Sequence, residues 1–194
     1  MQAMDQSHVS LFLLTFPPAS LEHFRCTSEF TIGLQFKSLI KVLKCAHKND
    51  IVTLQYNPSA TKTAPELLIL VESVEGSRLS DFSLKLIDID VETLMVPDVD
   101  FGANVTLPMF MLQRVVKDFK EMADTMCISV GKHGLKCSCS GDDGSGCVTM
   151  AQSDALRLDL KEPITMSVSL KYMMLFCKAV SFAEQGVLSL HHDV

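Results

Sequence analysis

Apolar residues recur along this chain with two different periods. Three stretches repeat apolar positions every three or four residues, which is typical of an amphipathic helix. They are Phe36, Leu39, Ile40 and Leu43 in the first, Leu112 to Met122 in the second, and about Ser167 to Val180 in the third, which is nearly all apolar. The pattern therefore predicts three helices, separated by long intervals.

Between these stretches, apolar and β-branched residues form short runs bounded by Gly, Asn and Asp clusters, as expected of strands. The expected strands are residues 9–13, 51–56, 67–72, 82–89, 126–130, 135–140, 147–151, 164–170 and 186–190. Many strands with a few separated helices predict an α+β fold. Residues 91–101 fit neither period and contain Pro97, so they are a candidate linker between two halves of similar plan.

The composition is that of an ordinary globular protein, with 47% hydrophobic and 21% charged residues among 194. This length suffices for one large domain or two small ones. No apolar run is long enough for a bilayer, and Asp5, Gln6 and His8 interrupt the stretch where a signal peptide would be apolar. We expect a soluble, intracellular protein.

Seven cysteines, an odd number without framework spacing, are expected to be buried small residues or free thiols. Cys137 with Cys139, and His191 with His192, are the pairs that hint at a metal, but neither has a second pair at ligand spacing. We therefore expect no metal and no cofactor.

Catalytic motifs are not found in the sequence. It has no Gly-rich phosphate loop, no HExxH and no GxSxG. Asp88, Asp90 and Glu92 alternate along one face of an extended segment, and we interpret them as solvated linker acids rather than a metal cluster. An enzyme is the least favoured hypothesis.

Basic charge is concentrated on the predicted helices. Segments 36–48, 109–122 and 168–180 carry nine of the 17 Lys and Arg residues but two of the 23 acids, although the whole chain has a net charge of −6. Lys37, Lys41, Lys44 and Lys48 are spaced so that they would share one helix face. Taken alone, the basic residues of each helix could be an ordinary solvent-exposed helix face. Three basic helices in an acidic chain instead favour a common surface for a polyanion, contacted through phosphates without sequence readout.

Several segments resemble the proliferating cell nuclear antigen family, the eukaryotic DNA sliding clamps. They are Met1 to Leu11, Phe24-Arg25-Cys26, Lys41 to Cys45, Ser80 to Phe82, Leu86 to Glu92, Val96-Pro97, Arg114, Lys117-Asp118, Lys132 to Lys136, Glu162-Pro163 and Lys171-Tyr172. The resemblance covers essentially the whole chain. It implies two similar clamp domains with outer β-sheets and basic helices lining a ring, and domain boundaries at 1–85, 86–102 (an interdomain connector) and 103–194.

The resemblance also implies roles for single residues. Those expected to contact DNA are Arg25, Lys37, Lys41, Lys44, Arg114, Lys117, Lys171 and Lys178. A pocket for a short partner motif, with one Gln, one aliphatic and two aromatic residues, is expected at Met4, His8, Val9, Leu11, Leu94, Val96, Pro97 and Phe101. Without the resemblance these would be plain core residues, and His8 a structural histidine. Cys45 and Phe82 match the family's subunit contact, and Lys132 matches a lysine that receives ubiquitin or a relative.

The implied function is a processivity factor for DNA polymerase in replication and repair. Its implied partners are double-stranded DNA, polymerase and other clamp-binding proteins, a clamp loader and two further copies in a homotrimer, in the nucleus and without a membrane. Compared with the family, the first strand, helix and strand and the last strands are expected to be missing, so both domains would be incomplete. The alternative is a clamp-derived interaction module that no longer encircles DNA.

Overall fold

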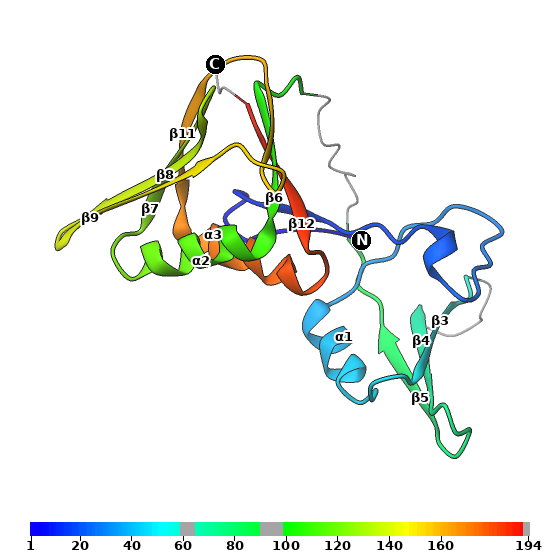
Figure 1. Ribbon diagram of the computed structural model, residues 1–194. Coiled ribbons are helices and arrows are strands. Elements are labelled where there is room, and N and C mark those ends of the chain that lie inside the picture. The colour runs from blue at the N-terminus through cyan, green and yellow to red at the C-terminus, as the bar shows by residue number, and fades with distance from the viewer. Residues whose placement is uncertain (59–64, 90–98, 192–194) are drawn as a thin grey trace. The chain divides into compact units, whose positions relative to one another are not determined.

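The computed structural model describes residues 1–58, 65–89 and 99–191 (Figure 1). Contacts divide the chain into two compact units: Met1–Thr15 with Val96–Val194 form unit 1, and Phe16–Met95 form unit 2. Leu94, Val96 and Pro97 of the expected pocket, with Asp90, Glu92 and His192, lie outside the described residues.

Residues 99–191 of unit 1 form two antiparallel sheets and two α-helices. The four-stranded sheet has the order β11 (Ile164–Ser169), β7 (Thr125–Gly131), β8 (Gly134–Gly141), β9 (Gly144–Ala151). The three-stranded sheet has the order β10 (Arg157–Leu160), β6 (Ala103–Pro108), β12 (Gln185–Leu190). The helices are α2 (Met109–Lys120) and α3 (Leu170–Phe176), and a 3₁₀ turn, η2 (Cys177–Ser181), follows α3 directly.

One apolar core joins these elements. Alternate residues of β6 (Ala103, Val105, Leu107) are fully buried, as are Met126 and Ile128 of β7. The buried face of α2, formed by Leu112, Val115, Val116 and Phe119, belongs to the same cluster. The helices therefore pack on the strands through the apolar positions that the periodicity indicates.

A small hairpin precedes unit 2 in the chain and belongs to unit 1 by its contacts. Strands β1 (Gln2–Met4) and β2 (Leu11–Leu13) pair antiparallel with Met4 opposite Leu11. Unit 2 then begins with a 3₁₀ turn, η1 (Pro18–Ser20).

Unit 2 packs one helix, α1 (Phe36–Leu43), against a sheet of order β3 (Ile51–Tyr56), β4 (Glu66–Glu72), β5 (Leu79–Lys85). Leu39 and Val42 of α1 are buried in one cluster with three alternate residues of β4. The predicted first helix and the strand 51–56 are thus confirmed.

Other predicted elements need correction. The helix predicted from Ser167 to Val180 starts only at Leu170, because Ser167 and Ser169 belong to β11, and it tightens to a 3₁₀ turn at Cys177. The second helix starts at Met109, as the segment 109–122 predicts, but ends at Lys120 instead of Met122. Strands β1, β6 and β10 were not predicted.

Candidate nucleic-acid and partner surfaces

Helix α2 carries exposed basic residues opposite its buried face. Arg114 and Lys117 are exposed, and at about 100° per residue they project away from Val115, Val116 and Phe119. Lys120 is half-buried and donates to Asp124 Oδ1 at 2.6 Å, which offsets its charge. The cations of α2 that are available to a polyanion are thus Arg114 and Lys117.

Lys171 of α3 and Lys178 of η2 are also exposed. Helix α2 contacts both elements, and Gln113 Nε2 donates to the carbonyl oxygen of Cys177 at 3.2 Å. Burial raises the pKa of the Cys177 thiol, and the positive charge of Lys117 opposes that shift. Two of the predicted basic helices therefore lie together in unit 1.

The basic face of α1 is shorter than predicted. Lys37 and Lys41 are exposed on the helix, and exposed Lys44 caps its C-terminus. Lys48, by contrast, lies outside the helix, so its place in the predicted helical row is wrong. The helix ends at Leu43, and the chain then turns through Asn49, which has a φ of 77°. Arg25 is exposed in the loop that precedes α1.

At the tip of the β1–β2 hairpin, one carboxylate organises the turn. Asp5 Oδ1 accepts the backbone N–H groups of Val9 at 2.9 Å and Ser10 at 2.7 Å, and Oδ2 accepts that of Ser7 at 3.1 Å. Tyr172 Oη on α3 also donates to Oδ2, at 3.1 Å. The N–H of Ser10 is the largest cause of a strongly lowered pKa of Asp5, and the other three donors act in the same direction against desolvation.

The expected partner pocket is described only in part. Met4, His8 and Val9 are exposed and lie on or beside this hairpin tip. Leu11 is half-buried opposite Met4, and Phe101 is 36% exposed just before β6. All five belong to unit 1. The sequence did not predict the contact between Asp5 and Tyr172, because a local pattern cannot connect residues 167 positions apart.

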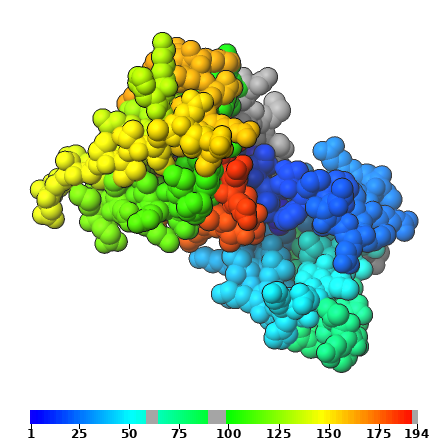
Figure 2. Space-filling view, viewed as in Figure 1, coloured from blue at the N-terminus to red at the C-terminus, as the bar shows by residue number. Residues whose placement is uncertain are grey.

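Two strands at sheet edges, β5 and β9, are candidates for the expected subunit contact. Within the described residues, β5 pairs only with β4, and β9 pairs only with β8. Phe82 is half-buried on β5, and Cys45 is exposed just after α1. On β9, Cys147 and Thr149 are exposed, and the β8–β9 hairpin projects from its unit (Figure 2).

Lys132 is exposed in the two-residue turn between β7 and β8. Gly134 follows it with a φ of 139°, and a Cβ there would lie 2.1 Å from the carbonyl oxygen of Met150. The turn thus requires glycine at 134 and leaves the Lys132 amine open to solvent.

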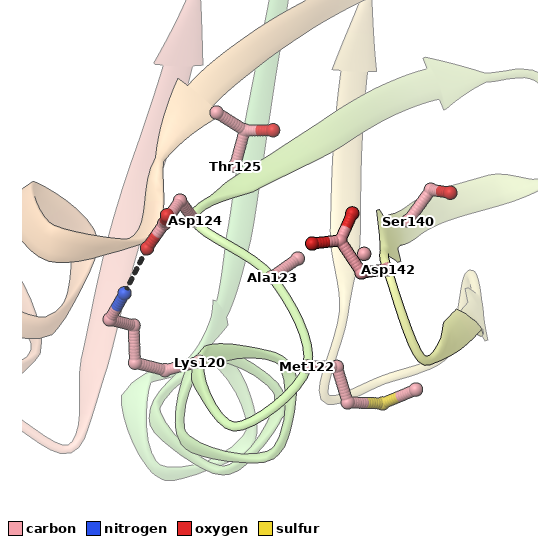
Figure 3. A pocket seen from close by; sticks show the side chains of 8 residues that line it. Lys120, Met122, Ala123, Asp124, Thr125, Ser140 and Asp142 are labelled. Carbon is pink, nitrogen blue, oxygen red and sulfur yellow. Dashed lines mark hydrogen bonds and ion pairs between the residues drawn. The ribbon is translucent and has the colours of Figure 1, made fainter.

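A shallow polar depression lies at the C-terminal end of α2, lined by Lys120, Asp124, Asp142 and neighbours (Figure 3). Across residues 1–58, 65–89 and 99–191, no three His, Cys, Asp or Glu side chains gather as metal ligands would. Cys137 and Cys139 are instead buried in the core.

Membrane-spanning helices are long and apolar throughout, unlike the helices of the described residues. None of them is long and apolar enough to cross a bilayer.

Comparison with known proteins gives a consistent result over the whole chain. Residues 1–94 match the family model for the N-terminal domain of proliferating cell nuclear antigen, and residues 95–194 match that for its C-terminal domain. The chain is also 36% identical over 202 residues to proliferating cell nuclear antigen from Chaetomium thermophilum. That alignment covers 100% of this chain and 76% of the relative.

Proposed function

The chain belongs to the proliferating cell nuclear antigen family, and from that premise we propose that it encircles duplex DNA as a homotrimeric ring and docks partner enzymes. Family membership confirms the resemblance, the α+β class with two clamp domains, and the expectation that the chain is not an enzyme. It is a sliding clamp of DNA replication by homology. The ring, the contacts and the partners are the parts we propose.

The observation that carries the proposal is the placement of basic charge on helices. Arg114 and Lys117 project opposite the buried face of α2, and Lys37 and Lys41 are exposed on α1. Lys44, Lys171, Lys178 and Arg25 complete the proposed set. These side chains reach phosphates but form no base-reading motif, so the contact is sequence-independent and weakens with salt.

A ring requires two different surfaces that fit each other, because head-to-tail contacts are heterologous. The edge of β5 in unit 2 and the edge of β9 in unit 1 are suitable, since each pairs with one strand only within the described residues. Edge-to-edge pairing in which β5 of one copy meets β9 of the next would satisfy the open backbone groups. Phe82 and Cys45 would lie at that contact.

Partner enzymes would dock a short motif in the pocket formed by Met4, His8, Val9, Leu11 and Phe101 together with Leu94, Val96 and Pro97. The exposed apolar side chains of Met4 and Val9 favour such a site, with exposed fractions of 37% and 67%. The partners would be DNA polymerase, a clamp loader and repair proteins in the nucleus. The exposed amine of Lys132 would accept ubiquitin or a relative.

Light-scattering mass over a dilution series tests the ring. A stable mass of three copies is expected. A monomer that still binds the motif peptide would instead support the alternative, a clamp-derived interaction module.

DNA binding is tested by Arg114→Glu with Lys117→Glu. The affinity for duplex DNA should fall, and the slope of log affinity against log salt should become shallower by about one for each phosphate that the variant no longer neutralises. Lys132→Glu with Lys136→Glu is the matched control, because it changes the charge equally and both lysines are exposed on the β7–β8 hairpin instead of the helix. An equal loss of affinity in the control would overturn the helix assignment.

A further inference from the structure

A single hydroxyl connects the hairpin tip with helix α3. Tyr172 Oη donates to Asp5 Oδ2 at 3.1 Å, and both side chains are half-buried. The other donors to this carboxylate are backbone N–H groups of the hairpin itself, whereas Tyr172 is a side chain from a distant part of the chain. Asp5 thus has local partners that shape the turn and one remote partner that fixes it in unit 1.

The turn that Asp5 shapes is an uncommon conformation. His8 has a φ of 56°, in the left-handed region that costs a residue with a side chain about 1 kcal/mol or more. The N–H groups of Ser7 and Val9, on either side of His8, both donate to the Asp5 carboxylate. The directions of the exposed His8 and Val9 side chains therefore depend on where that carboxylate is held.

The ring of Tyr172 is itself held on α3. The neighbouring Met173 is buried in the core, and the Lys171 ammonium lies 5.9 Å from the Tyr172 ring centroid. The helix that carries the hydroxyl is therefore anchored in the core of unit 1 by Leu170 and Met173.

We propose that Tyr172 is a positioning residue for partner recognition, because its hydroxyl fixes the Asp5–Ser10 turn in the conformation that presents His8 and Val9 to the partner motif. The inference rests on the proposed pocket for the motif. It assigns to α3 a second role beside the DNA contact, through a residue that touches neither ligand.

The test compares Tyr172→Phe with wild type in the full chain. The probe is a fluorescein-labelled peptide with one Gln, one aliphatic and two aromatic residues. Loss of a hydrogen bond to a charged group predicts affinity about tenfold weaker, and amide exchange of Ser7, Val9 and Ser10 about tenfold faster. DNA affinity at fixed salt should stay unchanged, since Lys171 and Lys178 are retained. Tyr56→Phe is the matched control, because Tyr56 lies on β3 and is the chain's other tyrosine.

A double-mutant cycle separates positioning from simple packing. In an Asp5→Ala background, Tyr172→Phe should have no further effect on peptide affinity or exchange, because its acceptor is gone. Additive losses, or normal exchange in Tyr172→Phe, would overturn the inference. If wild type fails to bind the peptide, the proposed pocket is wrong. The amide exchange rates of Ser7, Val9 and Ser10 still decide whether Tyr172 positions the turn.

Discussion

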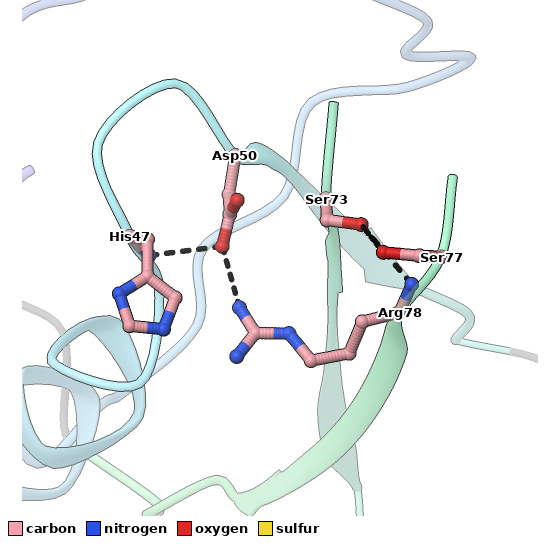
Figure 4. A network of polar contacts seen from close by, with 5 residues as sticks. All are labelled: His47, Asp50, Ser73, Ser77 and Arg78. Atoms are coloured by element: carbon pink, nitrogen blue, oxygen red, sulfur yellow. Dashed lines mark hydrogen bonds and ion pairs between the residues drawn. The ribbon is translucent and has the colours of Figure 1, made fainter. Parts of the chain in front are cut away.

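At the scale of single residues, carboxylates that accept several hydrogen bonds fix two loops of this clamp. Asp50 is one of them: Oδ2 accepts the N–H of His47 at 2.9 Å and a guanidinium N–H of Arg78 at 2.7 Å (Figure 4). Its side chain is 7% exposed. The N–H of His47 is the largest cause of its lowered pKa, and Arg78 acts in the same direction. Asp50 therefore ties the loop after α1 to the β4–β5 hairpin.

Arg78→Ala should raise the pKa of Asp50 toward, but not to, its ordinary value of 3.8, because the N–H of His47 remains. A pKa lowered by folding means that the unfolded chain binds more protons. The contribution to stability is thus complete above about pH 4 and is lost as pH falls through the lowered pKa. In the variant the contribution should be smaller, because its loss begins at the same unfolded-state pKa but ends at the higher pKa of the folded variant. Carboxyl ¹³C titration measures the pKa of Asp50 in wild type and variant. Arg157→Ala is the control for the loss of one positive charge. Identical Asp50 titrations in wild type and Arg78→Ala would contradict the prediction.

Thiol reactivity should follow the burial of each cysteine. Burial raises the pKa of Cys137 to about 11, and Cys147 is exposed on the neighbouring strand β9. Since the thiolate is the nucleophile, Cys147 should be alkylated at neutral pH much faster than Cys137. Mass spectrometry of a time course with iodoacetamide measures both rates, and unfolding in urea should make them equal. Comparable rates in the native chain would show that Cys137 is not in the core.

At the scale of elements, the buried core of unit 2 is formed by one strand and one helix. Leu67, Ile69 and Val71 alternate on the buried face of β4, and with Leu39 and Val42 of α1 they are the buried residues of this core. So small a core offers little redundancy, because each buried side chain supplies a large share of the apolar burial.

Ile69→Ala should therefore destabilise unit 2 by about 2–5 kcal/mol, the usual cost of such a cavity. The matched control is Leu68→Ala, since Leu68 is the next residue of β4 and is 39% exposed. Urea dependence of amide exchange in β3 to β5 measures both. A loss of stability in Leu68→Ala as large as that in Ile69→Ala would contradict the assigned face of β4.

Periodicity predicted the elements whose apolar positions have a clear phase. Helix α1 and strand β3 begin and end at the residues where the apolar pattern predicted them to begin and end. The third helix was misplaced because a nearly uniform apolar run gives no phase, so the change from β11 to α3 at Leu170 is invisible. Strand β10 is only four residues long and carries Arg157 and Asp159.

The candidate site was predictable to a similar degree. Charge counts located the basic helices, because exposed Lys and Arg residues need only the helical period to be placed. Lys48 was misassigned because the period says nothing of where a helix ends. The Asp5–Tyr172 contact joins residues that only the tertiary structure brings together.

At the scale of the whole molecule, the sheets have outer strands with a single neighbour among the described residues. The boundaries 1–85, 86–102 and 103–194 stay a prediction, and contacts assign Met1–Thr15 to unit 1. Strands β5 and β9 each have one described neighbour. A solvent-facing row of N–H and C=O groups favours pairing with another strand, so oligomer formation is the expected use of these edges.

Lysines on the β9 edge should therefore break the proposed ring. Cys147→Lys with Thr149→Lys places two charges on exposed positions of β9 without touching the core, and edge lysines oppose strand pairing between chains. The light-scattering mass should fall from three copies to one, while circular dichroism stays unchanged. Ser138→Lys with Ser140→Lys is the matched control, because β8 already has β7 and β9 as neighbours. A variant that keeps the three-copy mass would place the subunit contact away from β9. A control that falls apart equally would show that charge on the sheet, and not the open edge, decides assembly.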